Sequence, residues 1–175
     1  IKICLFACVM YGFSSCYYEH GSVRGYGNSM EFDVDISYAT RVELDGAMDI
    51  EIIPSDTFMV VIVAQENIAN LMVIETIGDV IKIDYRPRVN VVPTNVAKVV
   101  LYMPELYSVK LNGSGDIYIL DEYEQDSNME FMINGSGDIE NGSFICNKIE
   151  ATINGSGNLN ANFICHELET IIRGS

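Results

Sequence analysis

The chain has 175 residues, 49% of them hydrophobic, which suffices for one domain with a substantial core. Its 25 acidic and 10 basic residues give a formal net charge of -15, and such a surface repels nucleic acid and anionic lipid headgroups. The net charge does not oppose binding of cations, basic proteins or neutral glycans. Plentiful β-branched and aromatic residues, with no long stretch of helical periodicity, favour an all-β protein.

The N-terminus has the pattern of an export signal. Lys2 precedes an apolar run over residues 3–13, which is followed by small residues and Cys16. The run is shorter than the ~20 residues that span a membrane. A buried first strand is the alternative.

The residues before Cys16 resemble a bacterial lipobox, with Phe13 where leucine is usual. We therefore predict a lipoprotein-type signal peptide over residues 1–16, lipidation of Cys16, and a place at the outer membrane, the cell surface or in the periplasm. Simple cleavage is the alternative to lipidation.

Residues 17–31 are rich in Gly, Ser and Tyr and are predicted to be a tether. From residue 32 onward the apolar residues alternate with a period of two, which predicts strands. A helical turn is expected only at residues 66–71. The predicted strands of this half cover residues 32–36, 42–44, 49–52, 58–63, 72–76, 80–85 and 96–103.

The C-terminal part, residues 104–175, repeats an Asn-Gly-Ser-Gly motif. The first glycines of the successive copies are Gly113, Gly135, Gly155 and Gly174, spaced 22, 20 and 19 residues apart. The last copy is cut short, which we interpret as a C-terminal truncation, and residues 44–50 resemble a degenerate copy. A period near 20 with strand alternation predicts a β-solenoid (β-helix-like) with coils of 19–22 residues, and a plain meander is the alternative.

The motif is predicted to form a tight corner that is stacked in register from coil to coil. Its glycines provide backbone conformations with positive φ, and its asparagines are expected to stack as an amide ladder. The predicted corner residues are Asn112, Gly113, Ser114, Gly115, Asp116, Asn134, Gly135, Ser136, Gly137, Asp138, Asn154, Gly155, Ser156, Gly157 and Asn158.

A calcium site is the competing interpretation of the motif. Asp116 and Asp138 would stack above one another and attract a cation, but Asn158 interrupts the column, so a structural turn is favoured. Phosphate is not expected, since no lysine accompanies the glycine-rich loop and no helix follows it. No cofactor is therefore predicted, with calcium as the alternative.

The residues offer little for catalysis. His20 lies in the tether. His166 directly follows Cys165 on a predicted strand, so the side chains of Cys165 and His166 point to opposite faces and cannot form a catalytic dyad. Cys146 and Cys165, one repeat apart, should occupy equivalent positions as a stacked thiol pair or a disulfide.

The repeated Asn-Gly-Ser-Gly-Asp-Ile motif, the acidic strand-rich region before it and the lipoprotein-like leader resemble the head GIN domain family. The resemblance covers residues 32–175 and includes residues 42–52, 64–67 and 78–83. It implies a β-helix-like fold, a cell-surface or periplasmic location and a role as an auto-transporter adhesin in Bacteroides-like bacteria.

We therefore predict a non-enzymatic, exported binding or adhesion module. Its partner would be a host or surface glycan or protein, with no nucleic acid and with membrane contact only through the N-terminal lipid. A structural envelope protein that assembles through solenoid ends and a carbohydrate-active β-helix enzyme are the alternatives.

Overall fold

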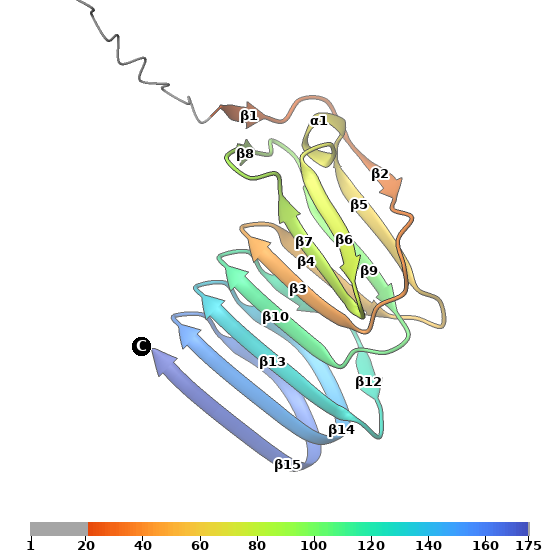
Figure 1. The fold of residues 1–175 in the computed structure, drawn as a ribbon, viewed down its shortest axis with the longest axis vertical. Helices are drawn as coiled ribbons and strands as arrows, with labels where there is room; N and C mark the ends of the chain where they lie inside the picture. The colour runs from red at the N-terminus through yellow and green to blue at the C-terminus, as the bar shows by residue number, and fades with distance from the viewer. Residues whose placement is uncertain (1–20, 175) are drawn as a thin grey trace, which may run out of the picture.

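The computed structural model describes residues 21–174, so the predicted signal peptide, Cys16, His20 and the start of the predicted tether lie outside the described residues. The described chain is mostly strand, with one helical turn (Figure 1). The elements of the first half are β1 (Ser22–Arg24), β2 (Ser29–Asp33), β3 (Arg41–Gly46), β4 (Asp49–Pro54), β5 (Met59–Gln65), α1 (Glu66–Ala69), β6 (Met72–Ile77), β7 (Val80–Tyr85), β8 (Asn90–Val92) and β9 (Lys98–Met103). The second half contains β10 (Ser108–Gly113), β11 (Ile117–Ile119), β12 (Glu122–Glu124), β13 (Asn128–Gly135), β14 (Ile139–Gly155) and β15 (Leu159–Gly174).

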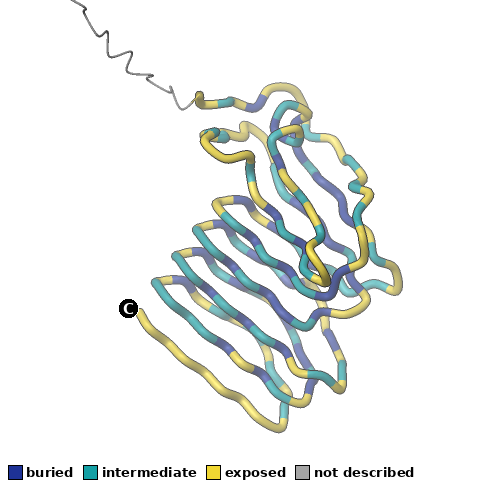
Figure 2. Tube along the Cα trace, viewed as in Figure 1, coloured by how far each residue is buried: buried dark blue, intermediate teal, exposed yellow. Residues whose placement is uncertain are grey.

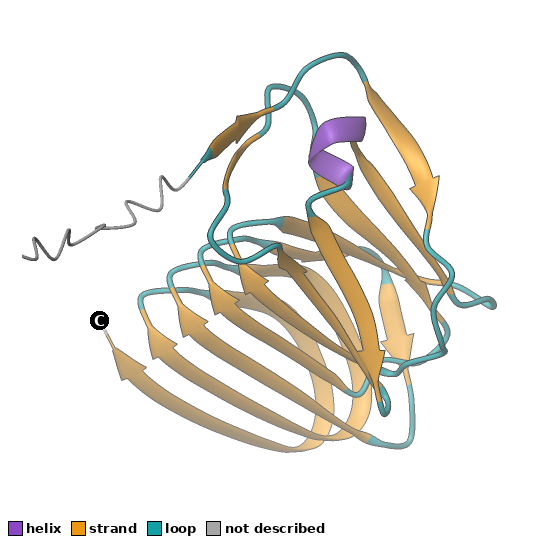
Figure 3. Ribbon diagram, turned by 45° about the horizontal axis from the view of Figure 1, so that its top comes forward, coloured by secondary structure: helices purple, strands orange, loops and turns teal. Residues whose placement is uncertain are grey.

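One mixed sheet of 13 strands makes up most of the fold. Its main path is β2-β5-β9-β4-β11-β14-β13-β10-β3-β7-β6, with β12 and β15 paired to β14. The pairs β2–β5, β5–β9 and β6–β7 are antiparallel, and the other pairs of this sheet are parallel. Strands β1 and β8 form a separate parallel pair. The large sheet curls around its buried face as an open half-barrel (Figure 3).

The all-β class is confirmed, but the predicted β-solenoid is wrong. One continuous mixed sheet curls around the core in place of repeated coils, and antiparallel strands lie at both ends of its path. Strand β14 is 17 residues long and pairs with β11 and β12 in its first part and with β13 in its second. The repeat spacing indicates which strands are neighbours, but it contains no information on how the first half of the chain closes the sheet.

The core lies between the two walls of the curl (Figure 2). Leu44, Leu111 and Ile133 on one wall are fully buried. So are Ile117 and Ile139 on the facing wall. Burial decreases toward β15, where Ile172 is 71% exposed. Strand β15 pairs only with β14 among the described residues.

The first half matches several sequence predictions. The helical turn predicted at residues 66–71 is confirmed by α1, and the turn predicted between residues 76 and 80 joins the β6–β7 hairpin, with Gly78 at φ 66°. The segment predicted as a tether differs, because β1 and the start of β2 lie within residues 17–31. These strands pair with β8 and β5, so this segment is held against the domain.

Candidate functional site

The Asn-Gly-Ser-Gly turns stack in register along one edge of the sheet. Asn134 Nδ2 donates to Asn112 Oδ1 at 2.8 Å, and Asn154 Nδ2 donates to Asn134 Oδ1 at 2.9 Å. Asn112 in turn donates to a carboxylate oxygen of Asp45 at 2.7 Å. At the other end Arg173 Nη1 donates to Asn154 Oδ1 at 3.5 Å. The ladder therefore has one direction, with a cationic donor at one end and an anionic acceptor at the other.

The glycines of the turns are required by close backbone approach. A Cβ on Gly135 would lie 2.0 Å from the carbonyl oxygen of Gly113, in a backbone conformation with φ 150°. A Cβ on Gly137 would lie 2.0 Å from the oxygen of Gly115. The serines Ser114, Ser136 and Ser156 line a shallow open groove over the same turns. The glycines of the motif therefore have a packing role, because a larger residue would not fit between the stacked turns.

The aspartates of the motif accept backbone hydrogen bonds. The N–H of Asp116 donates to Asp49 Oδ1 at 3.2 Å, and the N–H of Asp138 donates to Asp116 Oδ1 at 3.0 Å. Asn158 donates to Asp138 Oδ1 through both its backbone N–H and its side-chain amide. Each of these carboxylates thus accepts a hydrogen bond from the next copy of the turn, so the stacked aspartates have a structural role. No group of three or more His, Cys, Asp or Glu side chains that could hold a metal occurs within residues 21–174.

The cysteines and the described histidine lie away from these turns. Cys146 and Cys165 are register partners on β14 and β15, and both are free thiols. His166 lines a small cleft together with Cys146, Glu124 and Asp126. No helix in the described part of the chain is long and apolar enough to cross a membrane.

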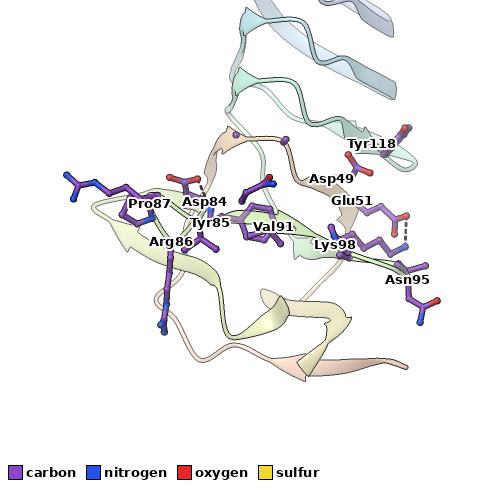
Figure 4. Close-up of a pocket in the computed structure, with 18 residues that line it drawn as sticks. Asp49, Glu51, Asp84, Tyr85, Arg86, Pro87, Val91, Asn95, Lys98 and Tyr118 are labelled. Carbon is purple, nitrogen blue, oxygen red and sulfur yellow. Dashed lines mark hydrogen bonds and ion pairs between the residues drawn. The ribbon is translucent and has the colours of Figure 1, made fainter. Parts of the chain in front are cut away.

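A larger cleft lies beside the turn between β3 and β4, at one end of the stack of turns (Figure 4). Its volume is about 780 Å³, within the ~300–1,000 Å³ of small-molecule sites. The walls come from residues 46–51, from residues 84–91 at the end of β7 and the loop after it, from residues 93–98, and from Tyr118 on β11. This cleft was not predicted.

Asp49 shares the cleft with two tyrosines, Tyr85 and Tyr118. Burial raises the pKa of Tyr85 to about 12, and the negative charge of Asp49 adds to this shift. The charge of Asp116 is the largest cause of the raised pKa of Tyr118, and Asp49 contributes there too. One carboxylate therefore influences both phenols, and all three residues line the same cleft.

The remaining charges of the cleft are balanced. Glu51 pairs with Lys98 at 2.6 Å, which the dashed line in Figure 4 marks. Burial raises the pKa of Asp84, and the charge of Asp45 adds to this effect, although a hydrogen bond from the Tyr85 N–H acts the other way. In total three carboxylates and three cationic side chains line the cleft, namely Asp49, Glu51, Asp84, Arg86, Arg88 and Lys98.

The loop of the cleft is stiffened at its tip. Pro87 fixes its own φ, and Arg88 follows in the left-handed region at φ 66°, which costs a residue other than glycine about 1–2 kcal/mol. In the sequence, Pro87 and Pro93 follow a predicted strand, and such prolines indicate a loop but not a cleft. The facing wall comes from residues 46–51, about 40 positions earlier, and no sequence pattern connects them.

The fold and this geometry can be compared with known proteins. The model of one family, described as "Putative auto-transporter adhesin, head GIN domain", matches residues 39–175. The chain belongs to the head GIN domain family. This confirms the family that the repeated motif resembles. The comparison with curated proteins found no match.

Two solved structures share the fold of this head GIN domain. A crystal structure of a "putative lipid binding protein" from Parabacteroides distasonis is 26% identical, with a TM-score of 0.76, over 86% of this chain. The chain spans only 65% of the length of that protein. A "putative adhesin" from Bacteroides fragilis is 14% identical, with a TM-score of 0.58, and 87% of this chain covers 96% of that one. Both likenesses agree with the curled sheet and not with a β-solenoid.

Proposed function

We propose that this head GIN domain is a non-enzymatic binding domain of an exported, adhesion-type protein, and that the cleft at residues 46–51 and 84–98 binds sugar units of a glycan. The observation that carries this proposal is that Tyr85, Tyr118 and Asp49, whose charge acts on both phenols, line one charge-balanced cleft.

A sugar ring matches this cleft chemically. Its C–H faces are apolar and flat enough to lie on an aromatic ring, which Tyr85 and Tyr118 provide. Its hydroxyls both donate and accept hydrogen bonds, and Asp49, Asp84 and Asn95 offer acceptors and an amide donor at the wall. This pairing of apolar and polar groups is what a cleft needs to orient a neutral, hydroxyl-rich ligand.

The charge of the molecule supports a neutral ligand. The net charge of -15 opposes the approach of nucleic acid and other polyanions. The three carboxylates that line the cleft are equalled in number by three cationic groups, so no net local charge favours an ion. Membership of an adhesin-type family supports an exported or surface location, and we propose that a lipid on Cys16 supplies the anchor.

The test uses the full chain on an array of neutral and acidic oligosaccharides and matrix proteins, with phosphatidylcholine vesicles as a separate arm. We expect saturable binding to neutral glycans. Asp49→Asn keeps an acceptor for the Asp116 N–H but removes the charge, and Tyr118→Ala removes one aromatic face. Each should weaken binding about tenfold or more, which corresponds to ~1.4 kcal/mol.

Two variants outside the cleft serve as matched controls. Asp56→Asn and Tyr26→Ala change the same residue types at exposed loop positions, and they should bind like the parent. Equal binding by the cleft variants and the parent would place the site elsewhere. Binding to vesicles alone would favour the lipid ligand that the name of the P. distasonis protein suggests, and release of shortened sugars would show an enzyme.

A further inference from the structure

Two free cysteines face one another on the last two strands. Cys146 on β14 and Cys165 on β15 are direct register partners in a parallel pair. Neighbouring strands lie about 4.8 Å apart, which is within the ~4.4–6.8 Å between Cα atoms that a disulfide bridges. The spacing of the two Cα atoms therefore permits a disulfide between these thiols.

Contacts on both sides of the pair fix this register. Two residues earlier, the rings of Phe144 and Phe163 pack with centroids 6.2 Å apart. Two residues later, Lys148 pairs with Glu167 at 3.0 Å. A slip of one residue would separate the two rings and the two charges, because side chains alternate between the faces of a strand. The thiols are thus held opposite one another.

The pair can be reached from solvent. Cys165 is only half-buried, and Cys146, although mostly buried, lines a cleft of about 460 Å³ together with Gln125 and His166. A small disulfide reagent can therefore contact Cys165, and Cys146 is next to it on the neighbouring strand.

We propose that Cys146 and Cys165 are an oxidisable pair that closes to an intramolecular disulfide between β14 and β15 when the domain meets a thiol–disulfide oxidant. The Cys165 thiolate attacks one sulfur of the oxidant's disulfide, forms a mixed disulfide and releases the first oxidant thiol. The Cys146 thiolate then attacks Cys165 Sγ and releases the second. The two cysteines are oxidised, the oxidant is reduced to two thiols, and the two cysteine protons pass to the released thiolates.

The order of attack follows from burial. Burial raises the pKa of the Cys146 thiol, and the charge of Cys165 adds to the shift, so less of Cys146 is thiolate at neutral pH. The more exposed Cys165 therefore reacts first, and Cys146 resolves the mixed disulfide.

The bond would staple the most weakly covered strand of the sheet. Strand β15 pairs only with β14 among the described residues, and most of its side chains are exposed. A cross-link between residues 146 and 165 restricts the unfolded chain and thereby stabilises the fold. The pair lies outside the cleft at residues 46–51 and 84–98, so its oxidation does not depend on which ligand that cleft binds.

The test uses the full chain with Cys4, Cys8 and Cys16 replaced by serine, so that only this pair carries thiols. The protein is incubated with oxidised glutathione, and free thiols are then counted in denaturant. We expect both thiols to disappear without a glutathione adduct, with the loss of two hydrogen atoms in the intact mass. Trypsin cleaves after Lys148, between the cysteines, so peptides 111–148 and 149–173 should remain joined until a reductant is added. The melting temperature should rise on oxidation and fall again on reduction.

Single variants distinguish the two roles. Cys146→Ser should keep a stable glutathione adduct on Cys165, since no resolving thiol is present, and Cys165→Ser should react slowly at the buried Cys146. Three results would each overturn the proposal for the protein that keeps both Cys146 and Cys165. These are persistence of both thiols, a stable glutathione adduct on either of them, and a disulfide between two chains. If a serine variant at position 146 or 165 fails to fold, the results for the protein that keeps both cysteines still test the proposal.

Discussion

The stacked turns predict that Gly135 tolerates no side chain. In Gly135→Ala the new Cβ would lie 2.0 Å from the Gly113 carbonyl oxygen, whereas folded proteins keep at least 3.0 Å, so the strands must separate by about 1 Å (3.0 minus 2.0). That oxygen accepts the N–H groups of Ser136 at 2.9 Å and Gly137 at 3.2 Å. Losing both hydrogen bonds costs ~2 kcal/mol, and the strained φ of 150° adds ~1–2 kcal/mol. We expect a loss of ~3–4 kcal/mol in the free energy of unfolding.

A second glycine with positive φ provides the control for this estimate. Gly78 has φ 66° in the β6–β7 turn, and a Cβ there would meet nothing within 4 Å. Gly78→Ala should therefore cost only the conformational term, ~1–2 kcal/mol. Urea unfolding of the parent and both variants, followed by circular dichroism, measures the difference. If Gly135→Ala proves no more costly than Gly78→Ala, close approach of the backbones does not explain the glycines.

Three further substitutions test other parts of the structure. Asn134→Ala removes an amide that donates to one neighbour and accepts from the next, so the free energy of unfolding measured in urea should fall by ~2 kcal/mol. Asn162→Ala, at an exposed site, is the near-neutral control. Phe144→Ala leaves a cavity among three aromatic rings in the core and should cost ~3–5 kcal/mol in the same measurement; a loss below ~1 kcal/mol would contradict the packing. Asp84 has a raised pKa in the fold, so its ionisation destabilises the fold as the pH rises through its unfolded pKa of about 3.9. Asp84→Asn should consequently raise the melting temperature at neutral pH but not below about pH 3; an equal shift at both would exclude this cause.

The local structure was largely predictable from the sequence, and the closure of the sheet was not. Strict alternation locates most strands because one face of each is buried. The recurrence of Asn112 at Asn134 and Asn154 indicates neighbours in register, and the ladder joins these residues. The same pattern gives no information on strands outside the repeat. The antiparallel pairing of β5 with β2 and β9 therefore turned the expected solenoid into a curled mixed sheet.

The candidate site was less accessible to prediction for a related reason. Asp116 and Asp138 drew attention because stacked carboxylates attract cations, yet each accepts a backbone N–H from the next strand. The cleft itself combines Asp49, Tyr85 and Tyr118 from three separate segments. Only the pairing of β4 with β9 and β11, and of β3 with β7, brings these segments together, and that pairing depends on tertiary structure.

The degenerate copy of the motif at residues 44–50 connects the stack of turns with the cleft. An inner position of the amide ladder must both donate and accept, which asparagine does, whereas the terminal position needs only an acceptor, and there the chain has Asp45. Burial raises the pKa of Asp84 at the end of the neighbouring strand β7, and the charge of Asp45 adds to this shift. Asp49 likewise ends the aspartate column, and the charge of its carboxylate acts on both tyrosines of the cleft. The departures of this copy from the repeat therefore lie where the stack ends and the cleft begins, so the repeats serve as the rigid support on which the cleft is built.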